Sequence, residues 1–390
     1  MSTLRIGVNL FPGVGGSGHL ATRLGEHLAQ RGHSIHFITY QRPFALMWEQ
    51  PRGIYVDLVD RLDYPLFSGI GSPYTMPLTS KILKVASDAK LDLLHAHYAI
   101  PHAMAAYMAR EICGLPYVVT LHGSDVHTLG VDPAYKPVVK FTVGKANAVT
   151  AVSGFLQKKA YEGLGIEREI QVIPNFIDTQ QFHPMGNCRL TIEGGCMSMT
   201  KGDKAETIDP EEKVLLHVSN FREVKRVTDL IDVMRVVVDS QPRTRLVIVG
   251  DGPSRVDVER RIEKLGLCNN VHLLGVRTNM QEIFCATDAF LLFSIVEGMP
   301  LVLLESMACE VPVVTTPAGG TPELVRPGID GIVTKGFEPD EFAQEVIRIL
   351  ENDSLRKKLA KAGRKRVVES FSADRIVPMY EAVFEEAVSS

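Results

Sequence analysis

The amino-acid sequence predicts an α/β protein of two domains, each built on a parallel sheet with helices on both faces. Its 390 residues exceed one ordinary hydrophobic core and suit two domains. Short apolar runs alternate with amphipathic stretches, which is typical of parallel sheets buried on both faces. The alternation stops over residues 177–212 and then restarts, so two such arrays follow each other along the chain.

The first array predicts strands at Arg5–Leu10, Ile35–Thr39, Leu91–His95, Tyr117–Leu121, Ala148–Val152 and Ile170–Ile173. Its apolar periodicity predicts helices at Ser17–Gln30 and Pro101–Ile112, and the second of these begins with a proline, as first turns often do.

The second array predicts strands at Val214–Val218, Leu246–Val249, Val271–Leu274, Ala289–Phe293, Val311–Thr315 and Gly331–Val333. Residues 177–212 carry Pro, Gly, Thr and mixed charge without a sustained period, which indicates a linker with a surface loop. The chain from Glu338 onward is rich in Lys, Arg and Glu and is predicted to be almost wholly helical.

Composition excludes several classes of partner. The net charge of −4 gives no field that would favour nucleic acid or an anionic membrane. The N-terminus lacks the pattern of a signal peptide, and no run of 18 apolar residues is present to span a membrane. The six cysteines form no CxxC pair in a chain too long to need disulfides, so the cytoplasm is the expected compartment.

A glycine-rich turn follows the first predicted strand. Gly13, Gly15 and Gly18 have the spacing of a dinucleotide fingerprint, in which glycines and a helix N-terminus approach a pyrophosphate. A nicotinamide enzyme also needs an acid after the second strand, and residues 38–42 contain none, although Arg42 could accept a 2′-phosphate. An anion site and an ordinary tight turn both remain open for these glycines.

Two acids lie eight residues apart in the second array. Glu297 follows a predicted strand at its carboxyl end, where open α/β sheets bind ligands. Glu305 lies about two turns into an apolar helix, where a carboxylate is costly unless it meets hydroxyls or a cation. A solvated surface acid is the alternative, and the apolar surroundings disfavour it.

A basic cluster follows the first strand of the second array. Arg222, Lys225 and Arg226 fall where a helix begins, and guanidinium groups bind diphosphate oxygens in pairs. A merely solvated cluster is the weaker explanation, because cations oppose the helix dipole at that end.

Histidines and acids give little sign of a metal. His95, His97 and His102 fit no common zinc spacing. The chain contains no Asp-x-Asp pair, so Arg and Lys side chains and helix N-termini must hold any diphosphate, and no metal is expected to be required. His122 differs, because it ends a predicted strand and is expected to reach into a site.

Together these motifs resemble glycosyltransferase family 4, with the GT-B fold, over essentially the whole chain. The resemblance also rests on the segments 122–125, 250–253 and 318–323, in the family's order. Within the family, residues 95–103, 174–178 and 219–226 resemble the members that transfer N-acetylglucosamine (GlcNAc) from UDP-GlcNAc to L-malate, which opens bacillithiol biosynthesis.

The resemblance implies two Rossmann-like domains facing a central cleft. Residues 1–176 and 373–390 would form the acceptor domain, with a C-terminal helix at about Ala373–Val388 crossing back onto it. Residues 213–372 would bind the nucleotide sugar, with 177–212 as linker and loop. The implied partners are two small molecules, UDP-GlcNAc and L-malate, without nucleic acid or membrane, and a homodimer is left open.

The resemblance also implies roles for individual residues. His122 and Glu297 would be catalytic, with His122 against the sugar ring and Glu297 near its 3-hydroxyl, while Glu305 would hold the ribose. The implied donor-binding residues are Gly15, Gly16, Arg222, Lys225, Arg277, Met299, Leu301, Val302 and Glu305. The implied acceptor-binding residues are Ser17, Tyr98, Thr120, Asn175 and Arg226.

The family's usual mechanism retains configuration: the acceptor attacks the face from which UDP leaves, and the β-phosphate takes its proton. The chain departs from the family pattern at Asn220, where most members have arginine, and at Pro300, where glycine is usual. The loop at 185–209, with Cys188 and Cys196, is longer than expected. Two alternatives stay open: transfer to another small or lipid-linked acceptor, and sugar-nucleotide binding without turnover.

Overall fold

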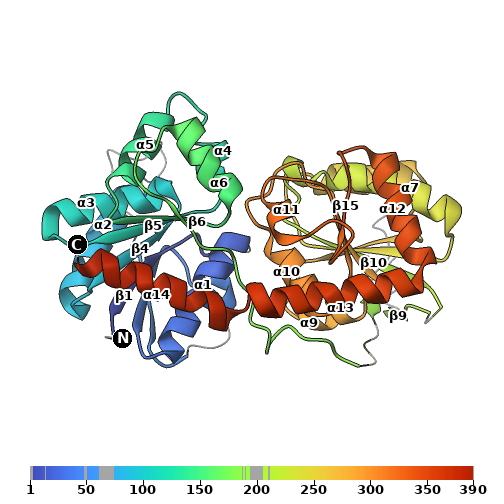
Figure 1. Ribbon diagram of the computed structural model, residues 1–390, viewed down its shortest axis with the longest axis horizontal. Helices are drawn as coiled ribbons and strands as arrows, with labels where there is room; N and C mark the ends of the chain where they lie inside the picture. The colour runs from blue at the N-terminus through green and yellow to red at the C-terminus, as the bar shows by residue number, and fades with distance from the viewer. Residues whose placement is uncertain are drawn as a thin grey trace. The chain divides into compact units, whose positions relative to one another are not determined.

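The computed structural model describes residues 3–13, 15–47, 51–60, 74–186, 188, 190–193, 205–209 and 211–389. By internal contacts the chain divides into two compact units. The first comprises Met1–Asn175 with Ala373–Ser390, and the second comprises Phe176–Ser372. Each unit contains a parallel sheet with helices on both faces, which confirms the predicted fold class (Figure 1).

The first unit has a seven-stranded sheet of order β3-β2-β1-β4-β5-β6-β7, with every described pairing parallel. The strands are β1 Arg5–Asn9, β2 Ser34–Thr39, β3 Ile54–Leu58, β4 Leu93–His97, β5 Tyr117–Leu121, β6 Ala148–Ala151 and β7 Gln171–Val172. All six predicted strands of this unit are present, and β3 was not predicted. The third strand begins and ends two residues later than predicted, which brings His97 into it.

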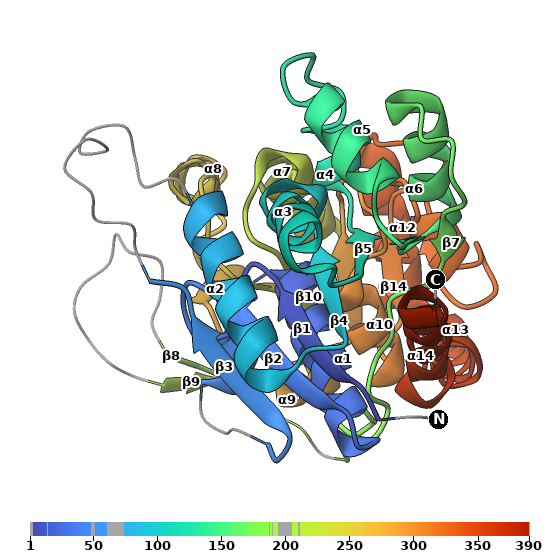
Figure 2. The same cartoon turned by 90° about the vertical axis from the view of Figure 1, so that its left-hand side faces the viewer.

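The helices of the first unit are η1 Phe44–Leu46, α1 Gly16–Gln30, α2 Thr75–Ala89, η3 Ala99–Ala103, α3 Met104–Cys113, α4 Ser124–His127, α5 Lys136–Gly144, α6 Gly154–Lys159, η4 Ala160–Leu164 and α14 Ala373–Ser389. Helix α2 packs against α3, and α1 packs against α14 (Figure 2). The helical run predicted from Pro101 is present: η3 continues directly into α3, and the break in helical backbone lies at Ile100, just before Pro101. Ile100 is extended (φ −129°, ψ 132°) before a cis bond to Pro101, because a residue before proline avoids the α region, and α3 begins at Met104.

The C-terminal helix α14 belongs to the first unit, as predicted. It packs on α1, β4 and β5, and the rings of Tyr380 and Phe384 are fully buried. Its Glu381 accepts two hydrogen bonds from Arg31, at 2.7 and 2.8 Å, and one from His33 at 3.1 Å. Although burial raises it, these bonds hold the pKa of Glu381 below its ordinary value.

The second unit has a six-stranded parallel sheet of order β12-β11-β10-β13-β14-β15. Its strands are β10 Lys213–Val218, β11 Thr244–Val249, β12 Val271–Gly275, β13 Ala289–Leu292, β14 Val313–Thr315 and β15 Ile332–Val333, as predicted within two residues. Its helices are η5 Glu223–Lys225, α7 Val227–Ser240, α8 Arg255–Lys264, α9 Met280–Cys285, α10 Leu301–Ala308, α11 Thr321–Leu324, α12 Pro339–Glu351 and α13 Asp353–Ser370.

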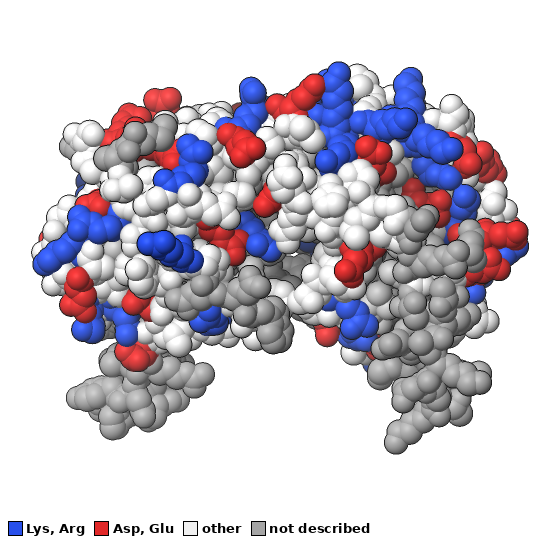
Figure 3. Space-filling view, turned by 90° about the horizontal axis from the view of Figure 1, so that it is seen from below, with Lys and Arg blue, Asp and Glu red and all other residues white. Residues whose placement is uncertain are grey.

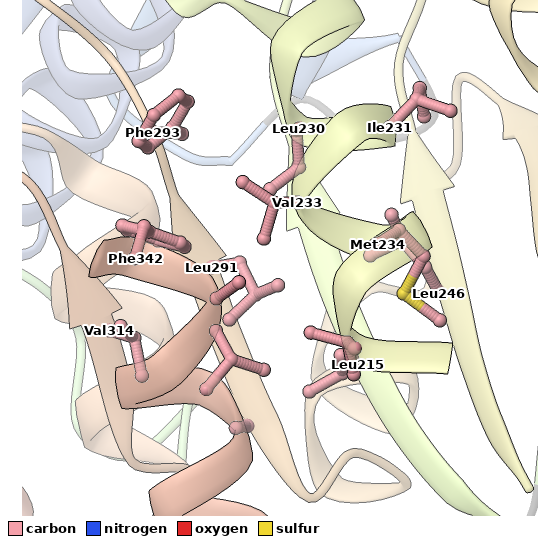
Figure 4. Packing of buried hydrophobic residues seen from close by; sticks show 14 of the residues in the cluster. Leu215, Leu230, Ile231, Val233, Met234, Leu246, Leu291, Phe293, Val314 and Phe342 are labelled. Atoms are coloured by element: carbon pink, nitrogen blue, oxygen red, sulfur yellow. The ribbon is translucent and has the colours of Figure 1, made fainter. Parts of the chain in front are cut away.

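The core of the second unit lies between its sheet and helices α7 and α12. Side chains of α7, such as Leu230 and Met234, meet Leu215 and Leu291 of the sheet and Phe342 of α12 (Figure 4). All five are essentially inaccessible to solvent. Burial of this apolar surface is the main force that holds α7 and α12 on the sheet.

The segment predicted as an irregular linker contains regular structure. Strands β8 Thr191–Glu193 and β9 Ala205–Thr207 form an antiparallel pair, and the segment clusters with the second unit. Cys196 lies outside the described residues.

The surface carries both charge signs. Lys and Arg side chains are interspersed with Asp and Glu side chains on the face drawn in Figure 3. No helix within the described part of the chain is long and apolar enough to cross a membrane.

In each sheet, the direction in which successive strands are added reverses at one position, which we call the winding reversal. In the first unit the reversal lies between β1 and β4, and in the second between β10 and β13. The loops after these strands depart to opposite faces, and ligands of open α/β sheets bind in the resulting crevice. The site should therefore be sought at the carboxyl ends of these four strands.

The glycine turn after β1 gives a test of the fold. A Cβ added at Gly18 would lie 2.2 Å from the carbonyl oxygen of Phe11, whereas one at Gly13 would meet nothing within 4 Å. We expect Gly18→Ala to destabilise the protein by about 1–3 kcal/mol, the usual cost of overpacking, and Gly13→Ala to be nearly neutral. Urea unfolding of both variants measures this, and equal stabilities would contradict it.

Candidate functional site

Two loops meet at the winding reversal of the second unit. Residues 219–226 follow β10 and residues 293–300 follow β13. The N–H of Ile295 donates to the carbonyl of Val224 at 3.0 Å, which fastens the loops together. The carbonyl of Glu297 in turn accepts from the N–H of Gly320 at 3.0 Å. The predicted basic cluster and the first predicted glutamate thus lie side by side.

Lys225 and Glu297 form an ion pair. Lys225 Nζ donates to Glu297 Oε1 at 2.6 Å, and the Glu297 side chain is only 8% exposed. A carboxylate so buried needs a charged or hydrogen-bonding partner, which Lys225 supplies. One residue predicted for the diphosphate and one predicted for the donor sugar are therefore in contact.

Glu305 lies on the short helix α10, close behind this pair in the chain. It is 8% exposed, as the predicted buried acid should be, and Met299 and Leu301 around the helix start are also buried. Pro300 occupies the position just before the helix, and its carbonyl accepts from Leu303 N–H at 3.3 Å. Its missing N–H therefore costs the first turn no donor, because the free donors of a helix start are those of the following residues, here Leu301 and Val302.

His217 is a site residue that sequence reasoning missed. Its ring bridges the two strands at the reversal, with Nδ1 donating to the carbonyl of Leu291 at 2.9 Å and Nε2 bonded to Ser219 Oγ at 2.9 Å. Burial lowers its pKa to about 4, so the ring is neutral. A histidine inside an otherwise apolar strand was the available signal.

The loop after β11 supports the loop after β10. Gly250 has φ +119°, and a Cβ there would lie 1.8 Å from the carbonyl oxygen of Ser219. Only glycine permits this approach of the two backbones. The Gly250–Pro253 segment, part of the family resemblance, thus fixes the backbone that carries Asn220 and Arg222.

The other predicted cations of the second unit differ in solvent exposure and in their bonding partners. Arg222 and Arg277 are exposed, and Arg277 follows β12 at the same edge of the sheet. The guanidinium of Arg226 is engaged within its own unit: it pairs with Asp229, donates to the carbonyl of Phe337 at 2.7 Å and lies over the Phe293 ring at 4.5 Å. Its predicted role in acceptor binding stays a prediction.

In the first unit, the glycine turn and the end of β4 meet at the reversal. Helix α1 begins at Gly16 with Gly15 before it, and Ser17 Oγ donates to Tyr98 Oη at 3.0 Å. Tyr98 has φ +85°, unusual for a residue with a side chain, and its N–H donates to Thr120 O at 3.2 Å. Such strain persists where surrounding structure enforces it, often at functional sites. Two predicted acceptor ligands are thus in contact.

His122 lies beside this pair. Its ring centroid is 5.3 Å from that of Tyr98, and the backbone N–H groups of His122 and Gly123 donate to the carboxylate of Asp125 at 2.8–3.3 Å. Burial, partly offset by these bonds, raises the pKa of Asp125 to about 6. Asp125 thus fixes the backbone that aims His122.

Thr120 and Asn175 occupy less accessible positions. The Thr120 hydroxyl is fully buried and bonds to His95 Nε2 at 2.7 Å and to Thr150 Oγ1 at 2.8 Å. Asn175 is 6% exposed at the end of the unit's first segment. The structure therefore brings Ser17, Tyr98 and His122 together and places the Thr120 hydroxyl in the core behind them.

Four histidines cluster behind Ser17 and Tyr98. His95, His97 and His102 are buried, and the ring centroid of His97 lies 4.1 Å from that of His95 and 5.1 Å from that of His122. Burial lowers the pKa of His95 and His122 to about 3 and that of His102 to about 4. Burial, together with the neighbouring imidazoles, also holds the pKa of His97 well below its ordinary value. All four are neutral near pH 7. Within the described residues, no three His, Cys, Asp or Glu side chains converge as metal ligands.

Comparison with known proteins is consistent with this geometry. The family described as "Glycosyltransferase Family 4" matches residues 14–181, and "Glycosyl transferases group 1" matches residues 198–366. N-acetyl-alpha-D-glucosaminyl L-malate synthase from Bacillus anthracis is 36% identical over 387 residues, covering 99% of this chain and 97% of that protein.

Solved structures share the fold. Sucrose-phosphate synthase from Thermosynechococcus elongatus has a TM-score of 0.81 at 19% identity, covering 99% of both chains. The Anabaena protein HepE in complex with UDP-glucose has a TM-score of 0.79 at 21% identity, covering 99% of this chain and 100% of that one. The class is therefore a glycosyltransferase with the GT-B fold. The chain belongs to glycosyltransferase family 4.

The neutral histidines predict acid sensitivity. In an unfolded chain a histidine binds a proton below about pH 6.5, whereas these four stay unprotonated when folded. Each should therefore lower the free energy of unfolding by about 1.4 kcal/mol per pH unit as the pH falls below 6.5, with Asp125 opposing over part of this range.

Urea unfolding between pH 7.5 and 5 measures this slope. His122→Asn should reduce it by about one histidine's share, about 1.4 kcal/mol per pH unit. His36→Asn, which removes a partly buried histidine that is paired with Asp57 outside this cluster, is measured alongside for comparison. A slope insensitive to His122→Asn would contradict the expectation.

Proposed function

We propose that this protein transfers GlcNAc from UDP-GlcNAc to the hydroxyl of L-malate with retention of configuration. The proposal rests on the similarity to N-acetyl-alpha-D-glucosaminyl L-malate synthase, which is 36% identical over nearly the full length of this chain. The site agrees with it chemically, since one unit offers cations and a buried acid for a nucleotide sugar, and the other offers hydroxyls for a small polar acceptor.

On the donor side, Arg222, Lys225 and the N-terminus of α10 would bind the diphosphate. Helix starts and guanidinium groups both suit phosphate oxygens. Glu305 would accept hydrogen bonds from the ribose hydroxyls, and the backbone about Arg277 would contact uracil. Lys225 is held at 2.6 Å by Glu297, which fixes its ammonium group beside the loop that would meet the diphosphate.

On the acceptor side, Ser17 and Tyr98 would position malate. Their hydroxyl groups are bonded at 3.0 Å, so both are placed without a ligand. Asn175, Thr120 and Arg226 complete the proposed set, Thr120 through its backbone or through the buried network behind it. A dicarboxylate suits hydroxyl, amide and guanidinium donors.

The reaction follows from this arrangement. The malate hydroxyl oxygen bonds to the anomeric carbon on the face where the bond to the UDP oxygen breaks. The hydroxyl proton passes to the departing β-phosphate, which Lys225 and Arg222 stabilise. In this proposal Glu297 and His122 would stabilise the sugar as its ring gains positive charge, so the protein's contribution is positioning and charge stabilisation. The described cysteines are all free thiols, which suits the cytoplasm.

UDP release tests the proposal directly. Purified protein is given UDP-GlcNAc or UDP-glucose with malate, inositol phosphate or buffer alone. We expect UDP-GlcNAc with malate to be fastest by at least about tenfold. Release with inositol phosphate alone would identify another acceptor, and binding of UDP-GlcNAc without release under any condition would mark a binding protein.

The proposal includes metal independence. The absence of an Asp-x-Asp pair from the sequence leaves the diphosphate to Arg222, Lys225 and α10. We expect EDTA to change the rate of UDP release by less than about twofold, since cations of the protein do the work of a metal. A rate that collapses in EDTA and returns with magnesium or manganese would refute this.

The two glutamates should fail differently. Glu305→Gln removes a charged acceptor present in ground and transition states alike, so donor binding should weaken by about 1.5–3 kcal/mol. Glu297→Gln removes negative charge beside a ring that becomes cationic, and it frees Lys225, so turnover should fall more than donor affinity.

Calorimetric binding of UDP-GlcNAc and turnover at saturating donor measure the contrast. Glu263→Gln, a change on the exposed face of α8, is the matched control and should change neither. If Glu305→Gln binds donor normally while Glu297→Gln loses affinity alone, the two roles are reversed.

A further inference from the structure

The pair His97 and His122 sits directly behind the proposed acceptor site. His97 ends β4, His122 follows β5, and the two strands are paired with His97 opposite Thr120. Nδ1 of His97 lies 2.8 Å from Nε2 of His122, and the rings are stacked at an angle of 24°. Because both rings are neutral, one of these two nitrogens carries the shared proton and the other accepts it.

The surroundings of His97 indicate which nitrogen donates. Its other nitrogen, Nε2, is buried and has no hydrogen-bond partner among the described residues. A proton on Nε2 would create a buried N–H without an acceptor, and such orphaned donors are rarer than under-satisfied acceptors. The proton therefore belongs on Nδ1, from which His97 donates to His122.

His102 shows the same solution in the same cluster. Its Nδ1 lies 2.6 Å from the carbonyl oxygen of His97, and a carbonyl only accepts, so Nδ1 of His102 carries the proton. Its Nε2 is then a bare acceptor, and it is likewise buried without a partner among the described residues. His102 also fixes the backbone of His97 through this bond.

We propose that His97 is a positioning residue that holds His122 in the neutral tautomer protonated on Nδ1, so that His122 offers an N–H donor to the substrates. This rests on the function proposed above. Because Nε2 of His122 is occupied by the bond from His97 and Nδ1 already carries a proton, His122 has no free lone pair with which to act as a base. The acceptor's proton must then go to the leaving phosphate, and His122 contributes a hydrogen bond to a sugar or acceptor oxygen.

The buried network behind His97 supports this role. His95 packs on His97 with ring centroids 4.1 Å apart and bonds to Thr120, which bonds to Thr150. Rings held on both sides cannot turn without breaking these bonds. Thr120, whose hydroxyl is too buried to meet a ligand directly, thus contributes to the acceptor site by restraining the histidines.

The test compares three substitutions at His97. His97→Asn keeps an N–H close to the position of Nδ1, His97→Leu removes the donor at similar volume, and His97→Gln moves the amide to the position of Nε2. Nitrogen-15 NMR of labelled histidine reports the tautomer of His122, whose signals are assigned by their loss in His122→Asn. Turnover and Michaelis constants for donor and malate are measured on the same samples, with His36→Asn as control.

We expect the Nδ1-protonated tautomer at His122 in the wild type and in His97→Asn, and a shift toward Nε2 protonation in the Leu and Gln variants. We expect kcat to fall about 10–100-fold in those two, as for other residues that orient a site histidine, and to recover to within a few-fold in His97→Asn. Donor affinity should change little throughout.

Protonation of His122 on Nε2 in the wild type would overturn the proposal, as would equal losses of kcat in the Asn and Leu variants. If His97→Leu does not fold, the proposal is still tested by the tautomer of His122 in the wild type and by comparing kcat of His97→Asn with that of His97→Gln. Absence of transfer to malate by the wild type would defeat the proposed function, while the NMR measurement would judge the tautomer independently.

Discussion

The reversal of winding in each parallel sheet is the constraint from which the site follows. A right-handed crossover places each connecting helix on one face, and the face changes only where the strand order reverses. That happens between β1 and β4 and between β10 and β13. Side chains after these strands therefore border the crevice at the reversal. Ser17 and Tyr98 occupy these positions in the first unit and are hydrogen-bonded to each other. Lys225 and Glu297 occupy them in the second unit and form an ion pair.

Placing polar groups at the ends of buried strands has a cost, and the protein limits it by keeping most of them neutral. His217 holds the reversal of the second unit with bonds from both ring nitrogens. In the first unit, the four clustered histidines bond to one another or to Thr120. The charged exceptions are paired, as Glu297 is with Lys225. Neutral imidazoles give directed hydrogen bonds without the desolvation cost of a buried ion. At neutral pH, hydrogen bonds therefore hold these side chains within each unit.

Apolar runs in the sequence predicted most of the strands. They did not predict the edge strand β3 or the direction of individual side chains. Strand β3 was overlooked because it is an edge strand whose buried residue Ile54 is followed by exposed and half-buried ones. Residue types and turn position led to the prediction of Glu297, Glu305, Lys225 and His122 as site residues, and the structure brings Lys225 and Glu297 into contact. The direction of a side chain could not be predicted in the same way. Thr120 is the residue before the last one of β5, and its side chain points into the core. His97 was considered only as a possible metal ligand. Contacts between strands far apart in the chain decide both cases.

The last helix shows how far such contacts reach. Tyr380 and Phe384 of α14 lie within 5.7 Å and 5.1 Å of the His95 ring, measured between centroids, and His95 packs on His97. Arg31 and His33 bind Glu381 and fix the helix in that position. Residues about 280 positions after His95 in the sequence thus pack directly against the histidine cluster. Because α14 comes last in the chain, the histidine cluster of the first unit cannot be complete until the second unit has been synthesised and α14 packs on the first unit.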